Sequence, residues 1–199
     1  VPKGYGWDGL LEKSGTALTD HYQATLNKLG KEKGLLGDIF AGALSKFREP
    51  VNLKKLILLI NETEWAELDV DLKAEAYEGL LQKFAAEQKG AGQYFTPREA
   101  IRAIVRCVRP DIGSRDDPAG RLYTIHDPAC GTAGFLIATA EWNLKHRGQA
   151  LTREEQKRLR HGALSGGEIV LETRRLALMN LYLHGIEGDI HYGDSIAEG

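Results

Sequence analysis

The stretch Thr-Ile-His-Asp-Pro-Ala-Cys-Gly-Thr-Ala-Gly-Phe, residues 124–135, decides the predicted fold. Its short apolar run ends at Asp127-Pro128, because proline cannot donate a hydrogen bond to a β-ladder. Gly131 and Gly134 follow, and an apolar helical pattern begins directly after them. Open α/β sheets build ligand sites from a strand, a glycine turn and a helix, since glycine lets backbone approach a ligand and the helix N-terminus offers unpaired N–H groups.

The chain beyond this stretch continues the same alternation. The helix that starts at Phe135 should end near Gly148. A charged helix is then predicted at residues 153–161 and a strand at 163–169. Another helix at 172–184 and a last strand at 188–192 follow. Strand, helix, strand, helix, strand predicts a parallel half-sheet with right-handed connections.

The first half of the chain has a different pattern. Apolar residues recur at helical spacing over residues 53–60, with Asn52 as the expected N-cap, and again after Asp71. No strand pattern precedes residue 120. We therefore predict an α/β protein with a helical domain over residues 1–90, followed over residues 91–199 by the first part of a Rossmann-like sheet domain.

A glycine-opened segment with two aromatics, residues 90–95, leads into Thr96-Pro97-Arg98-Glu99. Threonine, proline at the next position and glutamate three residues after the threonine predict a capping box at the start of a helix. One interpretation is a capped helix, with the two aromatics of the preceding segment packed into the core. The other is a helix N-terminus that meets an anionic group, such as a ligand carboxylate.

Composition excludes several classes of protein. The 26 lysines and arginines nearly balance 28 aspartates and glutamates, so the chain has no overall basic field for nucleic acid. Its two cysteines lack metal-ligand spacing, which predicts no metal site and fits a reducing, cytoplasmic compartment. The longest apolar run is too short to cross a membrane, and no signal peptide is visible.

An acidic residue lies at or just after the end of each predicted strand. Glu168 ends the second strand, where a carboxylate can accept hydrogen bonds from ribose hydroxyls. Asp194 follows the third strand and is a candidate acceptor for an exocyclic amine. Asp127 ends the first strand and is a candidate for contact with a cationic ligand group. Glu168 lies much farther from Gly131 than the roughly 20 residues of a dinucleotide fingerprint, which argues against a nicotinamide enzyme.

Several of these blocks together resemble a known family. They are Gly-Gln-Tyr-Phe-Thr-Pro-Arg at residues 92–98, Asp-Pro-Ala-Cys-Gly-Thr-Ala-Gly-Phe at 127–135, Gly-Glu at 167–168 and the segment 173–185. In this order they are similar to the modification (M) subunit of type I restriction-modification systems, in the N6-adenine DNA methylase family. The stretch 53–86, with Ala-Tyr-Glu-Gly-Leu-Leu at 76–81, resembles that family's N-terminal domain, so the likeness spans roughly residues 30–196.

The resemblance implies a site for S-adenosyl-L-methionine. Its expected binding residues are Gln93, Tyr94, Phe95, Thr96, Pro97, Arg98, Asp127, Gly131, Thr132, Ala133, Gly134, Glu168 and Asp194. By the family pattern, residues 93–98 close over the methionine end and residues 132–134 pass beneath it, while Glu168 takes the ribose and Asp194 lies near the adenine. The implied partners are double-stranded DNA, the specificity (S) and restriction (R) subunits and a second M subunit.

The sequence departs from the family at the reacting base. The catalytic Asn/Asp-Pro-Pro-Phe/Tyr signature does not occur, and the chain has no Pro-Pro at all. We assign no catalytic residue and expect the chain to be a portion of a longer protein. A methyltransferase for RNA, protein or a small molecule, and a non-catalytic module that assembles a restriction complex, remain open.

A second group of residues has no role in the resemblance. Basic side chains gather at residues 145–147 and again along the charged segment 153–161. They are interpreted as a solvated face, with contact to DNA phosphates or to a partner subunit as the alternative.

The missing signature generates a prediction. We expect residues 1–199 by themselves to transfer no methyl group to DNA, because an enzyme that acts on a base must extrude and hold that base. A radiolabelled-methyl assay on duplex DNA, with a complete adenine methyltransferase as positive control, measures this. Turnover by residues 1–199 would contradict the prediction.

Overall fold

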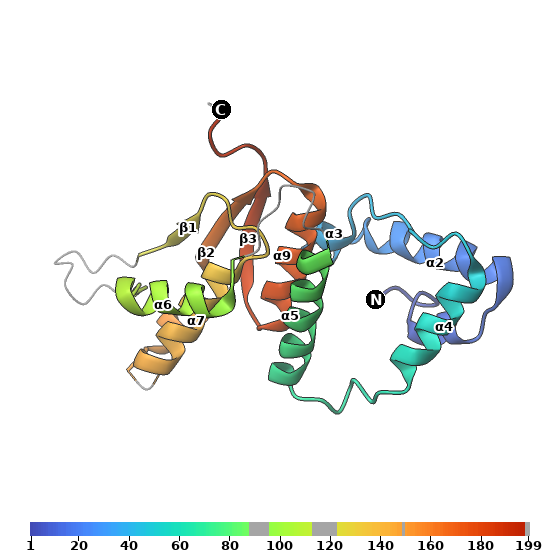
Figure 1. Cartoon of the computed structure of the whole chain (residues 1–199), viewed down its shortest axis with the longest axis horizontal. Coiled ribbons are helices and arrows are strands. Elements are labelled where there is room, and N and C mark those ends of the chain that lie inside the picture. The colour runs from blue at the N-terminus through green and yellow to red at the C-terminus, as the bar shows by residue number, and fades with distance from the viewer. Residues whose placement is uncertain (88–95, 113–122, 149, 198–199) are drawn as a thin grey trace. The chain divides into compact units, whose positions relative to one another are not determined.

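The computed structural model describes residues 1–87, 96–112, 123–148 and 150–197 (Figure 1). The chain divides into two compact units, Val1–Leu68 and Asp69–Gly199. Among the helices in the described ranges, none combines the length and apolar character that a membrane crossing requires.

The first unit consists of helices. They are α1 (Trp7–Leu11), α2 (Gly15–Leu29), α3 (Leu35–Phe40) and α4 (Pro50–Asn61). Buried Leu10, Leu18, Leu53 and Ile57 form a core there, so Leu53 and Ile57 of the expected apolar stripe face inward, whereas Leu56 is exposed. The Lys54 ammonium group donates hydrogen bonds to the carbonyls of Leu11 and Lys13, at 2.6 and 2.9 Å, and so ties α4 to the end of α1.

The start of α4 differs from the prediction. The helix begins two residues before Asn52, with Pro50 in its first turn and Glu49 at the N-cap. The backbone N–H of Asn52 already donates to the Glu49 carbonyl, so Asn52 lies inside the helix and the N-cap assignment was wrong. Proline suits a first helical position because its φ is helical and that position needs no N–H donor.

The second unit contains the parallel sheet. Its elements are α5 (Val70–Glu87), α6 (Arg98–Val108), β1 (Ile125–Asp127), α7 (Gly134–Arg147), α8 (Arg153–Arg160), β2 (His161–Glu168), α9 (Leu171–Leu183) and β3 (Glu187–Tyr192). The strands lie in the order β1-β2-β3 and all pair in parallel. The predicted mixture of helices and a small parallel sheet is therefore confirmed, with helices between successive strands (Figure 1).

The two faces of the sheet differ in chemistry. Leu164 and Ile190 are almost fully buried on the face that packs against helices. His126, Ser165 and His191 alternate with these residues and lie on the other face, as the register requires. The His126 ring shares a 2.9 Å hydrogen bond with Ser165 and stacks on His191, with ring centroids 5.8 Å apart.

Helix α5 is grouped with the sheet. It packs on α9, where the Tyr77 hydroxyl donates to the Leu176 carbonyl at 3.3 Å, and burial raises the pKa of that hydroxyl. The boundary between the compact units falls between Leu68 and Asp69. The domain boundary expected between residues 90 and 91, from the helical pattern of the first half, stays a prediction.

The basic residues in the last turn of α7 do not all face solvent. Arg147 is half-buried and forms ion pairs with Asp111 and Glu155, so its charge holds the segment after α6 and helix α8 against α7. Thr152 and Glu155 form a capping box at the start of α8, with bonds of 2.7 and 3.2 Å. Arg153 and Lys157 are exposed, in line with a solvated face.

Asn143 on α7 fixes the segment that follows α6. Its side chain is fully buried, and its amide nitrogen donates to the carbonyls of Pro110 and Thr139 at 2.9 Å. Its amide oxygen accepts from the backbone N–H of Ile112 at 3.3 Å. One side chain thus satisfies a backbone donor and a backbone acceptor in a segment that has no ladder of its own.

We expect Asn143→Ala to lower the free energy of unfolding by roughly 2–4 kcal/mol, because it leaves a buried carbonyl and a buried N–H without partners. Urea denaturation followed by circular dichroism measures the loss. Lys145→Ala, on the exposed side of the same helix, is the matched control and should change little. Equal losses in the two variants would contradict the prediction.

Candidate functional site

Three acidic side chains gather at the carboxyl edge of the sheet. Asp127 and Glu168 are the last residues of β1 and β2, and Asp194 lies just beyond β3. Each accepts a hydrogen bond from the backbone two residues later: Ala129 N–H to Asp127 (3.2 Å), Val170 N–H to Glu168 (2.8 Å) and Ile196 N–H to Asp194 (2.9 Å). These bonds hold the carboxylates at the strand ends and use one oxygen of each.

The glycine loop after β1 lies against the end of β2. The Cys130 N–H donates to the Gly167 carbonyl at 2.9 Å. Cys130 lies beyond the end of β1, and Gly167 is the last residue but one of β2. Gly131 has φ +55°, and Ala133, which is completely buried, has φ +66°. A left-handed non-glycine residue is uncommon, and such conformations cluster at ligand sites. The loop therefore has the backbone geometry expected of a ligand-binding turn.

Cys130 is a packing residue of this loop. Burial, with the carboxylates of Asp127 and Glu168 as smaller causes, raises the pKa of its thiol to about 12. The thiol therefore stays protonated at neutral pH and is no nucleophile. This agrees with the sequence, which gave no reason for a catalytic cysteine.

The predicted capping box at Thr96 and Glu99 does not form. Helix α6 begins at Arg98, and Pro97 is the N-cap, with ψ 138° and a side chain that carries no hydrogen-bond acceptor. The Ile101 N–H donates to the Pro97 carbonyl, which makes this the first turn of the helix. Because Pro97 is still extended, Thr96 lies one residue too early to cap. The prediction was wrong.

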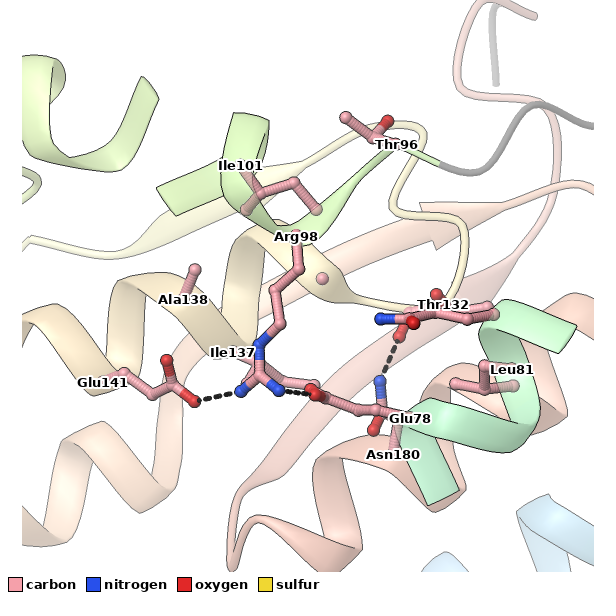
Figure 2. A pocket seen from close by; sticks show the side chains of 12 residues that line it. Glu78, Leu81, Thr96, Arg98, Ile101, Thr132, Ile137, Ala138, Glu141 and Asn180 are labelled. Carbon is pink, nitrogen blue, oxygen red and sulfur yellow. Dashed lines mark hydrogen bonds and ion pairs between the residues drawn. The ribbon is translucent and has the colours of Figure 1, made fainter. Parts of the chain in front are cut away.

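The start of α6 nevertheless meets the start of α7. Thr96 and Arg98 line one pocket together with Thr132 and Gly134 of the glycine loop (Figure 2). Gly134 permits this approach, because a Cβ there would lie 2.8 Å from the Ile101 side chain. Two segments that the sequence assigned to one site are thus neighbours in the structure.

Arg98 is held by two carboxylates that the sequence analysis did not select. Its guanidinium forms ion pairs with Glu78 of α5 and, at 3.0 Å, with Glu141 of α7, as the dashed lines in Figure 2 show. Glu78 also lies 3.5 Å from the His184 ring. Both acids occupy helical positions typical of a solvated face, so no local pattern distinguishes them from surface residues.

Asn180 is the other residue that sequence reasoning missed. It lies on α9, and its amide nitrogen donates to the Thr132 carbonyl at 2.9 Å, which fixes the glycine loop from below (Figure 2). An asparagine among leucines on a helix face is a weak signal for such a role. Gln93, Tyr94 and Phe95 lie outside the described residues, and the cofactor roles assigned to all the predicted site residues stay predictions.

The second compact unit matches the model of a known protein family. The N-6 DNA Methylase family matches residues 68–199, a range that begins one residue before the second compact unit. The chain belongs to the N-6 DNA Methylase family. The family predicted from the sequence motifs is thereby confirmed.

Curated relatives of this N-6 DNA methylase chain are methylase subunits of type I restriction enzymes. It is 37% identical to the StySJI subunit of Salmonella typhimurium and 36% identical to the EcoKI subunit of Escherichia coli. Both matches cover 100% of this chain and 37% of the relative. The chain therefore spans little more than a third of the length of these proteins.

A solved structure supports the fold. A chain from a study of complex assembly in the type I restriction-modification system matches with a TM-score of 0.73 and 25% identity. The match covers 98% of this chain and 40% of the other. The helices and parallel sheet described above are thus shared with a type I system protein.

The contact between the glycine loop and β2 generates a prediction. A Cβ at Gly166 would lie 2.9 Å from the Cys130 Cβ and 3.0 Å from the Asp127 carbonyl oxygen. We expect Gly166→Ala to lower the free energy of unfolding by about 1–3 kcal/mol, because backbone must move to relieve the overlap. Gly193→Ala, whose added Cβ would have its nearest contact at 3.8 Å, is the matched control in thermal or urea unfolding. A Gly166→Ala protein as stable as this control would show that the loop does not press on β2.

Proposed function

We propose that residues 1–199 form the cofactor-binding portion of a DNA adenine-N6 methyltransferase that uses S-adenosyl-L-methionine within a type I restriction-modification complex. The family match over residues 68–199 carries the proposal. Its physical support is the coincidence of a glycine loop and three acidic strand ends at one edge of a parallel sheet, where Rossmann-like folds bind ligands.

The residues at the strand ends suit the adenosyl part of this cofactor. Adenosine presents hydroxyl and amino donors, and carboxylates accept from both. Glu168 would accept from the ribose hydroxyls and Asp194 from the adenine amino group, each with its second oxygen. The loop has open space beside Gly131, where a Cβ would meet no atom within 4 Å. The cofactor carries no diphosphate, so no row of phosphate-binding N–H groups is needed.

The pocket between α6 and α7 suits the methionine part. Thr96 and Arg98 lie on one side and Thr132 on the other, so hydroxyl and charged groups line the same space. The rest of the lining is largely apolar and the pocket has a volume of about 30 Å³, so only the end of the methionine part would enter it. In this proposal Asp127 attracts the cationic end of the cofactor from the first strand.

When bound, the cofactor supplies a methyl group on a positively charged sulfur. The residues of this chain bind and orient it. The Val170 N–H holds the Glu168 carboxylate at the end of β2, and the Cys130 N–H bond to Gly167 holds the glycine loop over the same edge. Both bonds fix backbone next to the proposed site, which lowers the ordering cost of binding. The protonated Cys130 thiol takes no part in proton transfer.

Adenine in double-stranded DNA is the proposed substrate because the matching family is named for N-6 DNA methylation. The specificity and restriction subunits, and a second methylase subunit, are proposed partners because the relatives are methylase subunits of type I enzymes. This chain covers 37% of their length, so the target-base loop belongs in our proposal to the part that it does not cover. The complex would work in the cytoplasm.

We expect Glu168→Ala to weaken the binding of S-adenosyl-L-methionine by roughly 1–3 kcal/mol, the range for hydrogen bonds to a charged group. Isothermal titration calorimetry measures the affinity. Glu172→Ala is the matched control, because Glu172 is an exposed acid only one turn along the chain in the first turn of α9. Unchanged affinity in a folded Glu168→Ala protein would contradict the ribose assignment. A parent protein without affinity for the cofactor would contradict the proposed function.

A further inference from the structure

A groove runs along the second halves of α6 and α7, which lie side by side (Figure 1). It consists of two adjoining hollows with volumes of about 320 and 590 Å³. Buried Val105 and Ala138 contribute apolar surface to the first hollow. One water molecule occupies only about 30 Å³, so the groove has room for several side chains of a partner. The long side chains that line it are Arg102, Arg106, Arg109, Trp142, Lys145 and His146.

Positive charge accumulates along this groove. Arg106, Arg109 and Lys145 are exposed, and none of them forms an ion pair with a residue in the described ranges. Among the described lining residues Glu141 is the only acid, and it already pairs with two arginines of α6. The whole chain has a formal net charge of −2, so this local excess of cations is not a consequence of composition. The groove therefore attracts an anionic group.

An aromatic surface borders the same charges. The half-buried Trp142 indole packs on the buried apolar residues that α6 and α7 share. The His146 ring lies against the indole, with ring centroids 3.7 Å apart. Tryptophan and arginine carry much of the binding energy in protein–protein interfaces, whereas a nucleic-acid backbone is met mainly by cations and small polar groups. Cations combined with an aromatic and aliphatic surface thus favour a protein partner over DNA phosphates.

The groove lies away from the proposed cofactor site. The starts of α6 and α7 both line the pocket beside the glycine loop. At 1.5 Å per residue, Trp142 and His146 lie about 12 and 18 Å farther along α7 than its first residue, Gly134. A partner in the groove therefore leaves the carboxyl edge of the sheet open.

We propose that this groove docks a carboxylate-rich segment of another protein chain, whose apolar side chains pack against Trp142. The carboxylates of the segment pair with Arg106, Arg109 and Lys145, which supplies the negative charge that the groove lacks. An arginine can hold a carboxylate through two parallel hydrogen bonds, so these pairs also fix the direction of the segment. The proposal does not depend on the cofactor assignment.

The test measures the binding of fluorescent peptides to residues 1–199 by anisotropy. The first probe is Glu-Glu-Leu-Glu-Glu-Leu-Glu-Glu, and the second carries serine in place of each leucine and has the same charge. The first probe should bind about tenfold more tightly than the second, because only leucine gains from packing on the indole.

A matched pair of double variants locates the binding. Arg106→Gln/Lys145→Gln should weaken the binding of the first probe at least tenfold, because two of the three unpaired cations are lost. Arg153→Gln/Lys157→Gln removes the same two charges from exposed positions on α8 and should bind the probe as the parent protein does.

Several outcomes overturn the proposal. A parent protein that does not bind the first probe would show that the cations serve only the carbonyl ends of their own helices. Equal affinity for the two probes, or equal losses in the two double variants, would show attraction by charge alone. A short DNA duplex that binds through Arg106 and Lys145 and that the first probe does not displace would assign the groove to DNA phosphates.

A single charge reversal decides the matter if the double variant does not fold. Lys145→Glu places an acid beside the proposed carboxylates and should weaken the binding of the first probe several-fold. Lys157→Glu makes the same exposed change on α8 and should have little effect. Circular dichroism checks that each variant is folded. Equal affinities of Lys145→Glu and Lys157→Glu for the first probe would contradict the proposal.

Discussion

The close approach between the loop after β1 and the end of β2 is the constraint on which the site depends. The backbone bond from Cys130 to Gly167 joins the two strands beyond the point where their ladder ends. It is possible only because Gly166 has no side chain to meet Cys130 and Asp127. This contact turns the chain across the carboxyl edge of the sheet. Asp127 at the end of β1 and Glu168 at the end of β2 therefore lie at the same edge, and α7 starts beside them.

A second constraint acts through charge. The Arg98 guanidinium joins α5, α6 and α7 through Glu78 and Glu141, and Asn180 of α9 holds the glycine loop that lies between these helices. Charged groups that are partly removed from water must be paired, so the helices that carry them are confined to a few relative positions. The start of α6 and the glycine loop are thereby kept together.

Local sequence was a good guide where one periodicity dominated. The helices over α7 and α9 and the strand β3 were predicted to within a few residues, because their apolar spacing is regular. The strand β2 was also predicted to within two residues, although His-Gly-Ala-Leu-Ser-Gly-Gly-Glu is poor in β-forming residues. This segment forms a strand because β1 and β3 pair with it on both sides, and Gly166 allows the close contact with the loop after β1.

The sequence by itself determined the family, the order of helices and strands, and the acids at the strand ends, because each of these is written in spacing along the chain. It did not determine which polar groups meet. Thr-x-x-Glu occurs at Thr96 and at Thr152, yet only the second forms a capping box, because Pro97 stays extended and α6 starts at Arg98. Glu78, Glu141 and Asn180 join the site only because four helices pack around one pocket, and such long-range contacts leave no local pattern in the sequence.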